Sequence, residues 1–300
     1  MNVNPNKYIQ LKGDLISLET PIVMGILNVT PDSFFAESRK QADADIDARL
    51  AAIADEGGRI VDIGGCSSRP GGTDVPEEEE MRRLLPALRL AQHYPGLAVS
   101  VDTFRAGIAR RAVEEFGAAM INDISGGDLD PDMFGTAASL GVPYVLMHGR
   151  GSSATLSAGT VEGDLIVGIR KHLAERIDRL ELAGVNDIII DPGFGFGKTL
   201  EQNHELMAHL NCFGIFGMPV LVGVSRKSMI YRAAGTGPED SLSGTTALHV
   251  LALLNGADIL RVHDVREAAE AVRIVSTYKK YSNNKAQESH VDTIRNQRSD

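Results

Sequence analysis

Short apolar runs alternate with amphipathic helical patterns along most of the chain. The runs are mostly continuous rather than alternating with polar positions, which is typical of parallel strands that are covered on both faces. The eight predicted strands are Ile22–Leu27, Ile60–Ile63, Leu97–Val101, Ala119–Ile121, Pro143–Met147, Asp187–Ile190, Val220–Val222 and Asp258–Val262. Eight strands with helices between them predict an α/β fold, a single-domain (β/α)8 TIM barrel, and a doubly wound open sheet is the alternative.

Helices between the strands are indicated by apolar stripes at helical spacing. One stripe is formed by Met81, Leu84, Leu85 and Leu88, and a second by Leu165, Ile169, Leu173, Ile177 and Leu180. Pro76 and the acidic run Glu77–Glu80 precede the first stripe, and both features are favourable at a helix N-terminus. We therefore interpret the acidic run as a helix start rather than a metal site, and we expect Pro86 to kink that helix.

The barrel is predicted to span residues 21–280, with residues 1–20 as a short N-terminal extension. Gly149–Gly163 is rich in Gly, Ser, Thr and Ala and indicates a loop after the fifth strand. Residues 281–300 are polar and lack periodicity, so we expect them to form a disordered tail.

Composition limits the function classes. The chain has 300 residues, of which 43% are hydrophobic, so it can bury a large core. Its formal net charge of −10 argues against a nucleic-acid partner but not against an anionic small substrate held by local cations. The chain has two cysteines and no CxxC pair, Met1–Asp14 lacks a signal-peptide profile, and no stretch reaches the ~18 apolar residues of a membrane span. We expect a cytoplasmic protein without a membrane partner.

Polar side chains follow nearly every predicted strand, where the chemistry of an α/β barrel is built. These strand-end residues, at least one for each of the eight strands, are Asn28, Arg69, Asp102, Asn122, His148, Asp191, Lys227, Arg261 and His263. Helix capping explains one or two such positions, but it does not explain eight in a row. The sequence therefore predicts an active site at the carboxyl ends of the strands.

The residue types suggest two kinds of ligand group. Asp102, Asn122 and Asp191 can match the donor-rich edge of a heterocycle that carries an exocyclic amine, although Asp102 alone could equally be a helix cap. The opposite set, suited to a phosphate or diphosphate, comprises Arg69, Lys227, Arg261 and His263. Asn28 could help to hold Mg²⁺ against a diphosphate, or it could be a turn residue.

A glycine-rich segment after the sixth strand imitates a nucleotide-binding motif. Gly197-Lys198-Thr199 resembles the end of a phosphate-binding P-loop, but Pro192 stands where that motif needs a glycine. We interpret the segment as a turn that presents Phe194, Phe196 and Lys198 at the rim. The two aromatic rings could stack on a planar ligand or could belong to the core.

Taken together, these segments resemble the dihydropteroate synthase family of the bacterial folate pathway. The matching blocks occur in family order from Pro21 to Tyr278: MGILNVTPDSF (24–34), GGCSSRPGG (64–72), SVDT (100–103), INDISGG (121–127), VLMH (145–148), DPGFGFGKT (191–199), GVSRKSMI (223–230), GTTAL (244–248) and ILRVHDV (259–265). Several blocks are long and unusual, so the resemblance is specific.

The resemblance implies a transferase that joins 7,8-dihydropterin-6-ylmethyl diphosphate to 4-aminobenzoate and releases pyrophosphate. It implies pterin binding by Asp102, Asn122, Asp191 and Lys227. It implies diphosphate binding and catalysis by Arg69, Arg261 and His263 together with Lys227, and Mg²⁺ placed with help from Asn28. The aminobenzoate would be bordered by Ser68, Phe34, Pro70 and Phe196. Family members are commonly homodimers and sulfonamide targets.

Some positions depart from the family pattern. Ala36, in Phe35-Ala-Glu-Ser38, replaces a carboxylate that Glu37 could supply from the next position, and Cys66 and Ser68 stand where Glu and Thr are common. One alternative is therefore a silent paralogue that binds pterin without turnover. Another is a pterin-dependent methyltransferase of the same superfamily, but such an enzyme does not need the predicted cations.

Overall fold

Eight parallel strands form the central sheet of the computed structural model, which describes residues 7–29, 39–66, 75–149 and 163–296. Of residues 39–41 and 283–296 only the backbone is described. The strands are β3 (Ile22–Asn28), β4 (Ile60–Gly64), β5 (Ala98–Asp102), β6 (Met120–Asp123), β7 (Tyr144–Met147), β8 (Ile188–Asp191), β9 (Leu221–Val222) and β10 (Ile259–Val262). Each coincides with a predicted apolar run to within two residues, so all eight strand predictions are confirmed.

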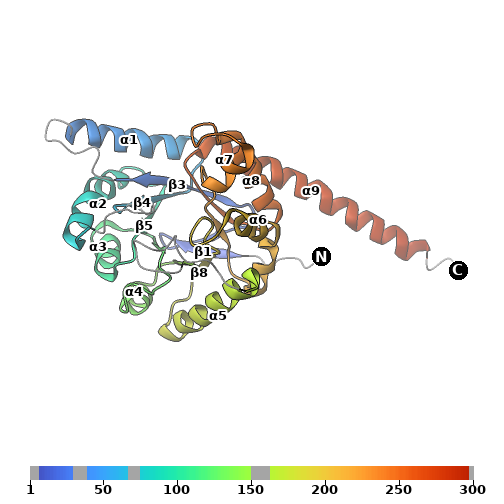
Figure 1. The fold of residues 1–300 in the computed structure, drawn as a ribbon, viewed down its shortest axis with the longest axis horizontal. Helices are drawn as coiled ribbons and strands as arrows, with labels where there is room; N and C mark the ends of the chain where they lie inside the picture. The colour runs from blue at the N-terminus through green and yellow to red at the C-terminus, as the bar shows by residue number, and fades with distance from the viewer. Residues whose placement is uncertain (1–6, 30–38, 67–74, 150–162, 297–300) are drawn as a thin grey trace.

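The sheet closes on itself. Its order is β8-β7-β6-β5-β4-β3-β10-β9, and the two edge strands meet where Ile190 bridges to Val220 in parallel. The Ile190 amide donates to the Pro219 carbonyl at 2.9 Å. The fold is therefore the predicted (β/α)8 barrel, and the open-sheet alternative is wrong (Figure 1).

Helices surround the barrel (Figure 1). They are α1 (Arg39–Asp55), α2 (Glu77–Ala91), α3 (Ala106–Phe116), α4 (Met133–Leu140), α5 (Leu165–Ala183), α6 (Leu200–Ala208), the 3-10 helix η3 (Leu210–Phe216), α7 (Ser228–Ala234), α8 (Leu242–Leu254) and α9 (Val265–Asn296). The apolar stripe of α5 is buried as predicted, and Gly184 ends that helix in the left-handed conformation. Helix α2 begins at Glu77, which confirms that the acidic run starts a helix.

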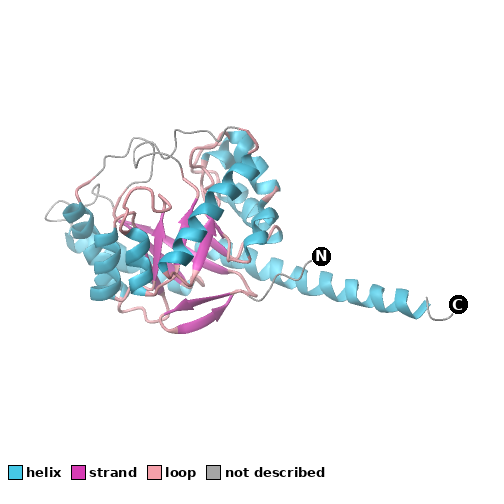
Figure 2. Ribbon diagram, turned by 90° about the horizontal axis from the view of Figure 1, so that it is seen from below, coloured by secondary structure: helices cyan, strands magenta, loops and turns pink. Residues whose placement is uncertain are grey.

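The N-terminal extension packs against the barrel. Strands β1 (Tyr8–Leu11) and β2 (Asp14–Ser17) pair antiparallel, and Figure 2 shows this hairpin below the barrel strands. Its buried side chains share a cluster with inward-facing barrel residues such as Met24 and Val145. Lys7 Nζ lies 2.6 Å from Asp258 Oδ2, just ahead of β10. The hairpin therefore caps the amino ends of the strands, opposite the predicted active site.

Helix α9 differs from the sequence-based expectation. It runs from Val265 to Asn296 and extends away from the barrel (Figure 1), although we expected no regular structure after residue 280. Polar residues that follow a formed helix add hydrogen bonds without a new nucleation cost, and the missing apolar periodicity does not prevent this. In the described part of the chain, no helix is both long and apolar enough to cross a membrane.

Candidate active site

The carboxyl ends of neighbouring strands bring several predicted residues together. Asp102 ends β5 and is paired in register with Asn122 on β6. Asp191 ends β8, and Arg261 lies on β10. The described residues therefore include the heterocycle-binding set and part of the cation set. Four predicted residues lie outside the described part of the chain: Phe34, Ser68, Arg69 and Pro70.

Arg261 links two carboxylates. Its Nε donates to Asp62 Oδ2 at 2.6 Å and its Nη2 donates to Asp102 Oδ2 at 2.7 Å. Asp62 is fully buried and also accepts from Ser100 Oγ at 2.6 Å and from Asn122 Nδ2 at 3.0 Å. The sequence predicted Arg261 within the set of cations suited to a diphosphate, and the structure places it between two carboxylates of the barrel.

The charges of this cluster depend on one another. Burial lowers the pKa of Arg261, but Asp62 and Asp102 outweigh it, so the pKa lies above the ordinary value and the guanidinium stays charged. Burial raises the pKa of Asp102 to about 7, Arg261 opposes that rise and Asp62 reinforces it. Near neutral pH, Asp102 therefore exists in both the carboxylate and the carboxylic acid forms.

Asp191 and Lys227 face each other across a glycine-rich turn. The Gly193 amide donates to Asp191 Oδ1 at 2.7 Å. Lys227 Nζ donates to the Phe194 carbonyl at 2.5 Å and lies 4.5 Å from the centroid of the Phe196 ring. Burial lowers the pKa of Lys227 to about 8, and Asp191 opposes this shift. Phe194 is a core residue, whereas Phe196 is half-buried at the rim beside Lys227.

Lys198 holds the same turn from within. Its Nζ donates to the carbonyls of Gly193 at 2.7 Å and Phe196 at 3.1 Å, and lies 3.1 Å from His148 Nδ1. We expected the turn to present Lys198 at the rim, but the ammonium group points inward, and burial lowers its pKa to about 7. Gly193 has φ +74°, and a Cβ there would overlap the His148 carbonyl. The conformation of the turn therefore depends on Lys198 and Gly193.

His263 is neutral in the ligand-free site. Burial and the neighbouring Arg261 lower the pKa of its imidazole to about 4. Its backbone is fixed from two sides, because its amide donates to Ser225 Oγ at 3.1 Å and its carbonyl accepts from Arg49 Nη2 at 2.7 Å. The sequence predicted His263 among the cations, whereas burial and the neighbouring arginines favour the neutral form of its ring.

Asn28 ends β3 with an exposed side chain. No group of three or more His, Cys, Asp or Glu residues that could hold a metal ion occurs among the described residues. Mg²⁺ commonly keeps several waters and binds through one or two protein oxygens together with substrate phosphates. The amide oxygen of Asn28 suits that mode of binding and would not suffice for an ion held by protein alone.

The sequence-based prediction missed Asp62, a buried residue that organises the site, and it placed Lys198 at the rim rather than inside the turn. Asp62 interrupts an otherwise apolar strand run, and this was the available signal, because a buried carboxylate needs hydrogen-bonding partners. No comparable signal marks the inward orientation of Lys198. Partial burial raises the pKa of the Cys66 thiol to about 12, so this cysteine is a poor nucleophile.

Comparisons with known proteins show the family of this chain. Residues 24–263 match the family described as pterin binding enzyme. The dihydropteroate synthase of Escherichia coli (strain K12) is 39% identical over 280 residues, which cover 92% of this chain and 98% of that protein. The dihydropteroate synthase of Bacillus subtilis (strain 168) is 38% identical over 276 residues, covering 91% and 94%.

Solved structures give the same result. The dihydropteroate synthase of Xanthomonas albilineans with 4-aminobenzoic acid has a TM-score of 0.81 at 40% identity, covering 91% of this chain and 98% of that one. The Yersinia pestis dihydropteroate synthase in a sulfonamide drug complex has a TM-score of 0.82 at 38% identity, covering 91% and 99%.

Proposed function

This chain belongs to the dihydropteroate synthases, the pterin-binding transferases of folate biosynthesis, and we propose how its residues divide the reaction between them. The reaction joins 7,8-dihydropterin-6-ylmethyl diphosphate to 4-aminobenzoate. The bond between the methylene carbon and the diphosphate oxygen breaks, a carbon–nitrogen bond forms, and pyrophosphate and one amine proton leave. The observation that carries the assignment of roles is Arg261, held between Asp62 and Asp102 where the strands end.

The pterin ring is proposed to bind Asp102, Asn122, Asp191 and Lys227. Asp191 and Asp102 offer oxygen acceptors to the amine-bearing edge of the ring, and Lys227 supplies a donor to the ring's acceptor atoms. Two of these side chains are already held by backbone or neighbouring groups, Asp191 by Gly193 and Asn122 by Asp62. Such preorganisation reduces the entropy lost when the ligand binds.

The diphosphate is proposed to bind Arg261 and His263, together with Arg69. An anion beside His263 would raise the pKa of its imidazole from the low value of the ligand-free site, so the ring could gain a proton as the diphosphate binds. Cations here stabilise the charge that grows on the departing oxygen as the carbon–oxygen bond breaks. Asn28 would help to hold Mg²⁺, which when bound neutralises diphosphate charge.

The aminobenzoate is proposed to lie against Phe196, with Ser68, Phe34 and Pro70 as further neighbours. Phe196 is half-buried at the rim, and its ring is fixed beside Lys227. In this position the arylamine would sit near the pterin methylene group. An arylamine is already nucleophilic, so holding it close to the developing cation accelerates the reaction without an activating base.

A homodimer is proposed on the basis of helices α8 and α9. Ile274, Tyr278 and Tyr281 are all at least 60% exposed and form one stripe on α9. Leu251 and Leu254 are exposed on α8, which packs against α9. Exposed apolar side chains on two neighbouring helices are a common feature of interfaces. Light scattering of the wild type and of Ile274→Glu/Tyr278→Glu tests this, and a monomeric wild type would refute it.

A cytoplasmic location is also proposed. Cys66 and Cys212 are both free thiols, and neither forms a disulfide. This suits a reducing compartment. Fractionation of cells that produce the chain tests the location, and recovery outside the cytoplasm would contradict it.

A pyrophosphate-release assay with pterin diphosphate, 4-aminobenzoate and Mg²⁺ tests the function. Release that depends on both substrates is expected. Pterin binding without pyrophosphate release would instead indicate a silent paralogue, an alternative suggested by Ala36 in place of the family's carboxylate. Asp191→Ala should abolish pterin binding measured by calorimetry, and Lys227→Ala should strongly reduce the rate. A near-wild-type result for either variant would remove that residue from the site.

A further inference from the structure

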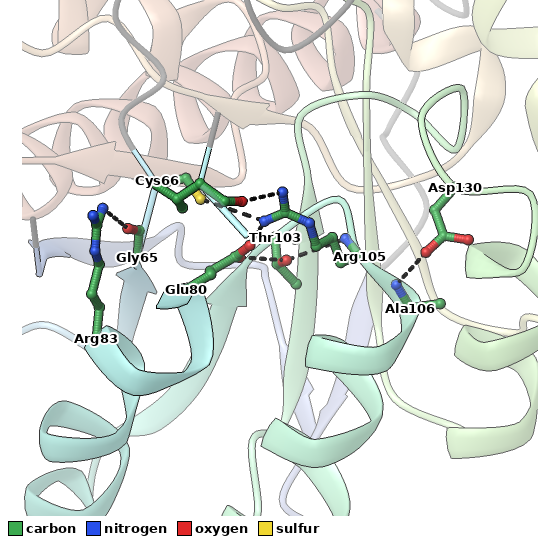
Figure 3. Close-up of polar contacts among 9 residues, drawn as sticks. Gly65, Cys66, Glu80, Arg83, Thr103, Arg105, Ala106 and Asp130 are labelled. Carbon is green, nitrogen blue, oxygen red and sulfur yellow. Dashed lines mark hydrogen bonds and ion pairs between the residues drawn. The ribbon is translucent and has the colours of Figure 1, made fainter. Parts of the chain in front are cut away.

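Arg105 connects two parts of the chain that are separated by residues 67–74. It lies between β5 and α3, and Figure 3 shows its guanidinium group between Cys66 and Glu80. Nη2 donates to the Val75 carbonyl at 2.6 Å, and Nη1 lies 3.8 Å from Cys66 Sγ. Cys66 and Val75 are the described residues on either side of 67–74. One side chain therefore contacts the chain before and after this segment.

Glu80 holds Arg105 in place. Its side chain is fully buried on α2, forms an ion pair with Arg105 Nη1, and accepts from Thr103 Oγ1 at 2.7 Å (Figure 3). Thr103 directly follows Asp102 and is itself buried. Arg83 on the same helix adds a donor 3.2 Å from the Gly65 carbonyl, one residue before Cys66. The cluster therefore connects the end of β4 to the end of β5.

This cluster is costly to build if it serves packing alone. A buried ion pair has a desolvation penalty that its mutual attraction often only balances, and apolar side chains of similar volume commonly stabilise a fold as well or better. The hydrogen bonds from Arg105 and Arg83 go instead to the backbone of Val75 and Gly65. Their effect is to fix the position of Gly65 after β4 and of Val75 before α2.

We propose that Arg105 and Glu80 are positioning residues for the reaction, because they fix Cys66 and Val75 relative to Asp102. The sequence between those two residues contains Ser68 and Arg69, to which the proposed function gives roles with aminobenzoate and diphosphate, and the inference rests on that function. Of the proposed pterin residues only Asp102 lies on β5, where Arg261 also holds its carboxylate, and the other three lie on or after other strands. Loss of the pair should therefore impair use of the second substrate and leave binding of the ring intact.

Arg105→Lys and Glu80→Gln test this proposal. Lysine keeps the charge beside Glu80 but lacks the planar fork that also reaches Val75. In both variants the KM for 4-aminobenzoate should rise about tenfold or more, the effect typical of misplaced substrate-positioning groups. The Kd for 6-hydroxymethylpterin, which lacks the diphosphate, should stay within about twofold of wild type because its binding residues are unchanged. Arg111→Lys, an exposed arginine on α3 paired with Glu115, is the matched control and should change neither value.

Different results would refute the proposed function and the positioning role of Arg105 and Glu80. No pyrophosphate release by the wild type would refute the proposed function itself. With an active wild type, folded variants that keep the wild-type KM for aminobenzoate would overturn the positioning role. A parallel loss of hydroxymethylpterin affinity and thermal stability would also overturn it, since the pair would then support the barrel as a whole.

Discussion

Arg261 on β10 and Asp62 on β4 form an ion pair across the mouth of the barrel, with Nε 2.6 Å from Oδ2. Strand β3 separates these two strands in the sheet, so the contact spans three neighbouring strands. Asp62 also accepts from Asn122, and in this way one buried carboxylate orients a proposed pterin residue and a proposed diphosphate residue together. The proposed pterin-binding residue Asn122 and the proposed diphosphate-binding residue Arg261 are therefore connected through Asp62.

Asp62→Asn should therefore damage stability and catalysis together. Removing one partner of a buried ion pair costs about 3 kcal/mol, because Arg261 keeps its charge with one carboxylate fewer. We expect a loss of that size in urea unfolding and a fall in kcat/KM of about 100-fold, equivalent to about 3 kcal/mol of transition-state stabilisation. Ser100→Ala removes only a neutral donor to Asp62 and should cost about 1 kcal/mol. A wild-type kcat/KM in Asp62→Asn would show that Arg261 does not need this partner.

Lys198→Met should weaken pterin binding although Lys198 points away from the proposed ligand. Methionine fills similar space but leaves the Gly193 and Phe196 carbonyls without their donor, so the turn that holds Asp191 and Lys227 loosens. We expect the Kd for hydroxymethylpterin to rise about tenfold, which corresponds to about 1.4 kcal/mol. Lys171→Met on the surface of α5 is the control. Equal affinities in the two variants would contradict the role of Lys198.

Pterin affinity should depend on pH through Asp102, whose pKa lies at about 7 in the ligand-free site. The ring offers N–H donors, so the ionised carboxylate is the better acceptor. Affinity should therefore rise as pH increases from 5.5 toward 7, with up to a tenfold change per pH unit where the group titrates, and should stop rising near pH 8, where Lys227 begins to lose its proton. Calorimetry across this range measures the effect. Asp102→Asn should bind weakly with no such dependence, and an unchanged pH profile in that variant would exclude Asp102 as its source.

His249 on α8 should make the fold sensitive to acid. Its ring is buried, neither nitrogen has a hydrogen-bond partner among the described residues, and burial lowers its pKa from 6.5 to about 4. Between these two values the unfolded chain binds a proton that the folded chain does not, so stability falls as pH drops from about 6.5 to about 4. The gap amounts to about 3 kcal/mol at most.

His249→Leu should remove much of this loss, as measured by urea unfolding at pH 4.5 and 7.5. His93→Leu, at an exposed position, provides the matched control and should keep the wild-type pH dependence. His263 titrates in the same range but is present in both proteins, so the difference between them isolates His249. Equal acid sensitivity of the wild type and His249→Leu would refute the prediction.

The strands and the site location were predictable because continuous apolar runs and the polar residues after them are local signals. The features that could not be predicted from the sequence depend on the direction in which a side chain points. Glu80 looked like one of four acidic residues at a helix start, yet it lies one turn before Leu84 and so shares the buried face of α2. Arg261 was assigned by charge alone, whereas its position is set by a carboxylate 199 residues away. Such long-range pairing leaves no trace in local periodicity.

The barrel has one weak seam. Strands β3 and β4 share five paired positions, but β8 meets the two-residue strand β9 through the single bridge between Ile190 and Val220. Asp191 and Lys227 stand on opposite sides of that seam. A pterin bound by both Asp191 and Lys227 would connect the two sides of this junction. Amide hydrogen exchange at Ile190 and Leu221 should therefore slow when the pterin binds. Substrate binding would then stabilise the junction between β8 and β9, where the backbone provides only one bridge.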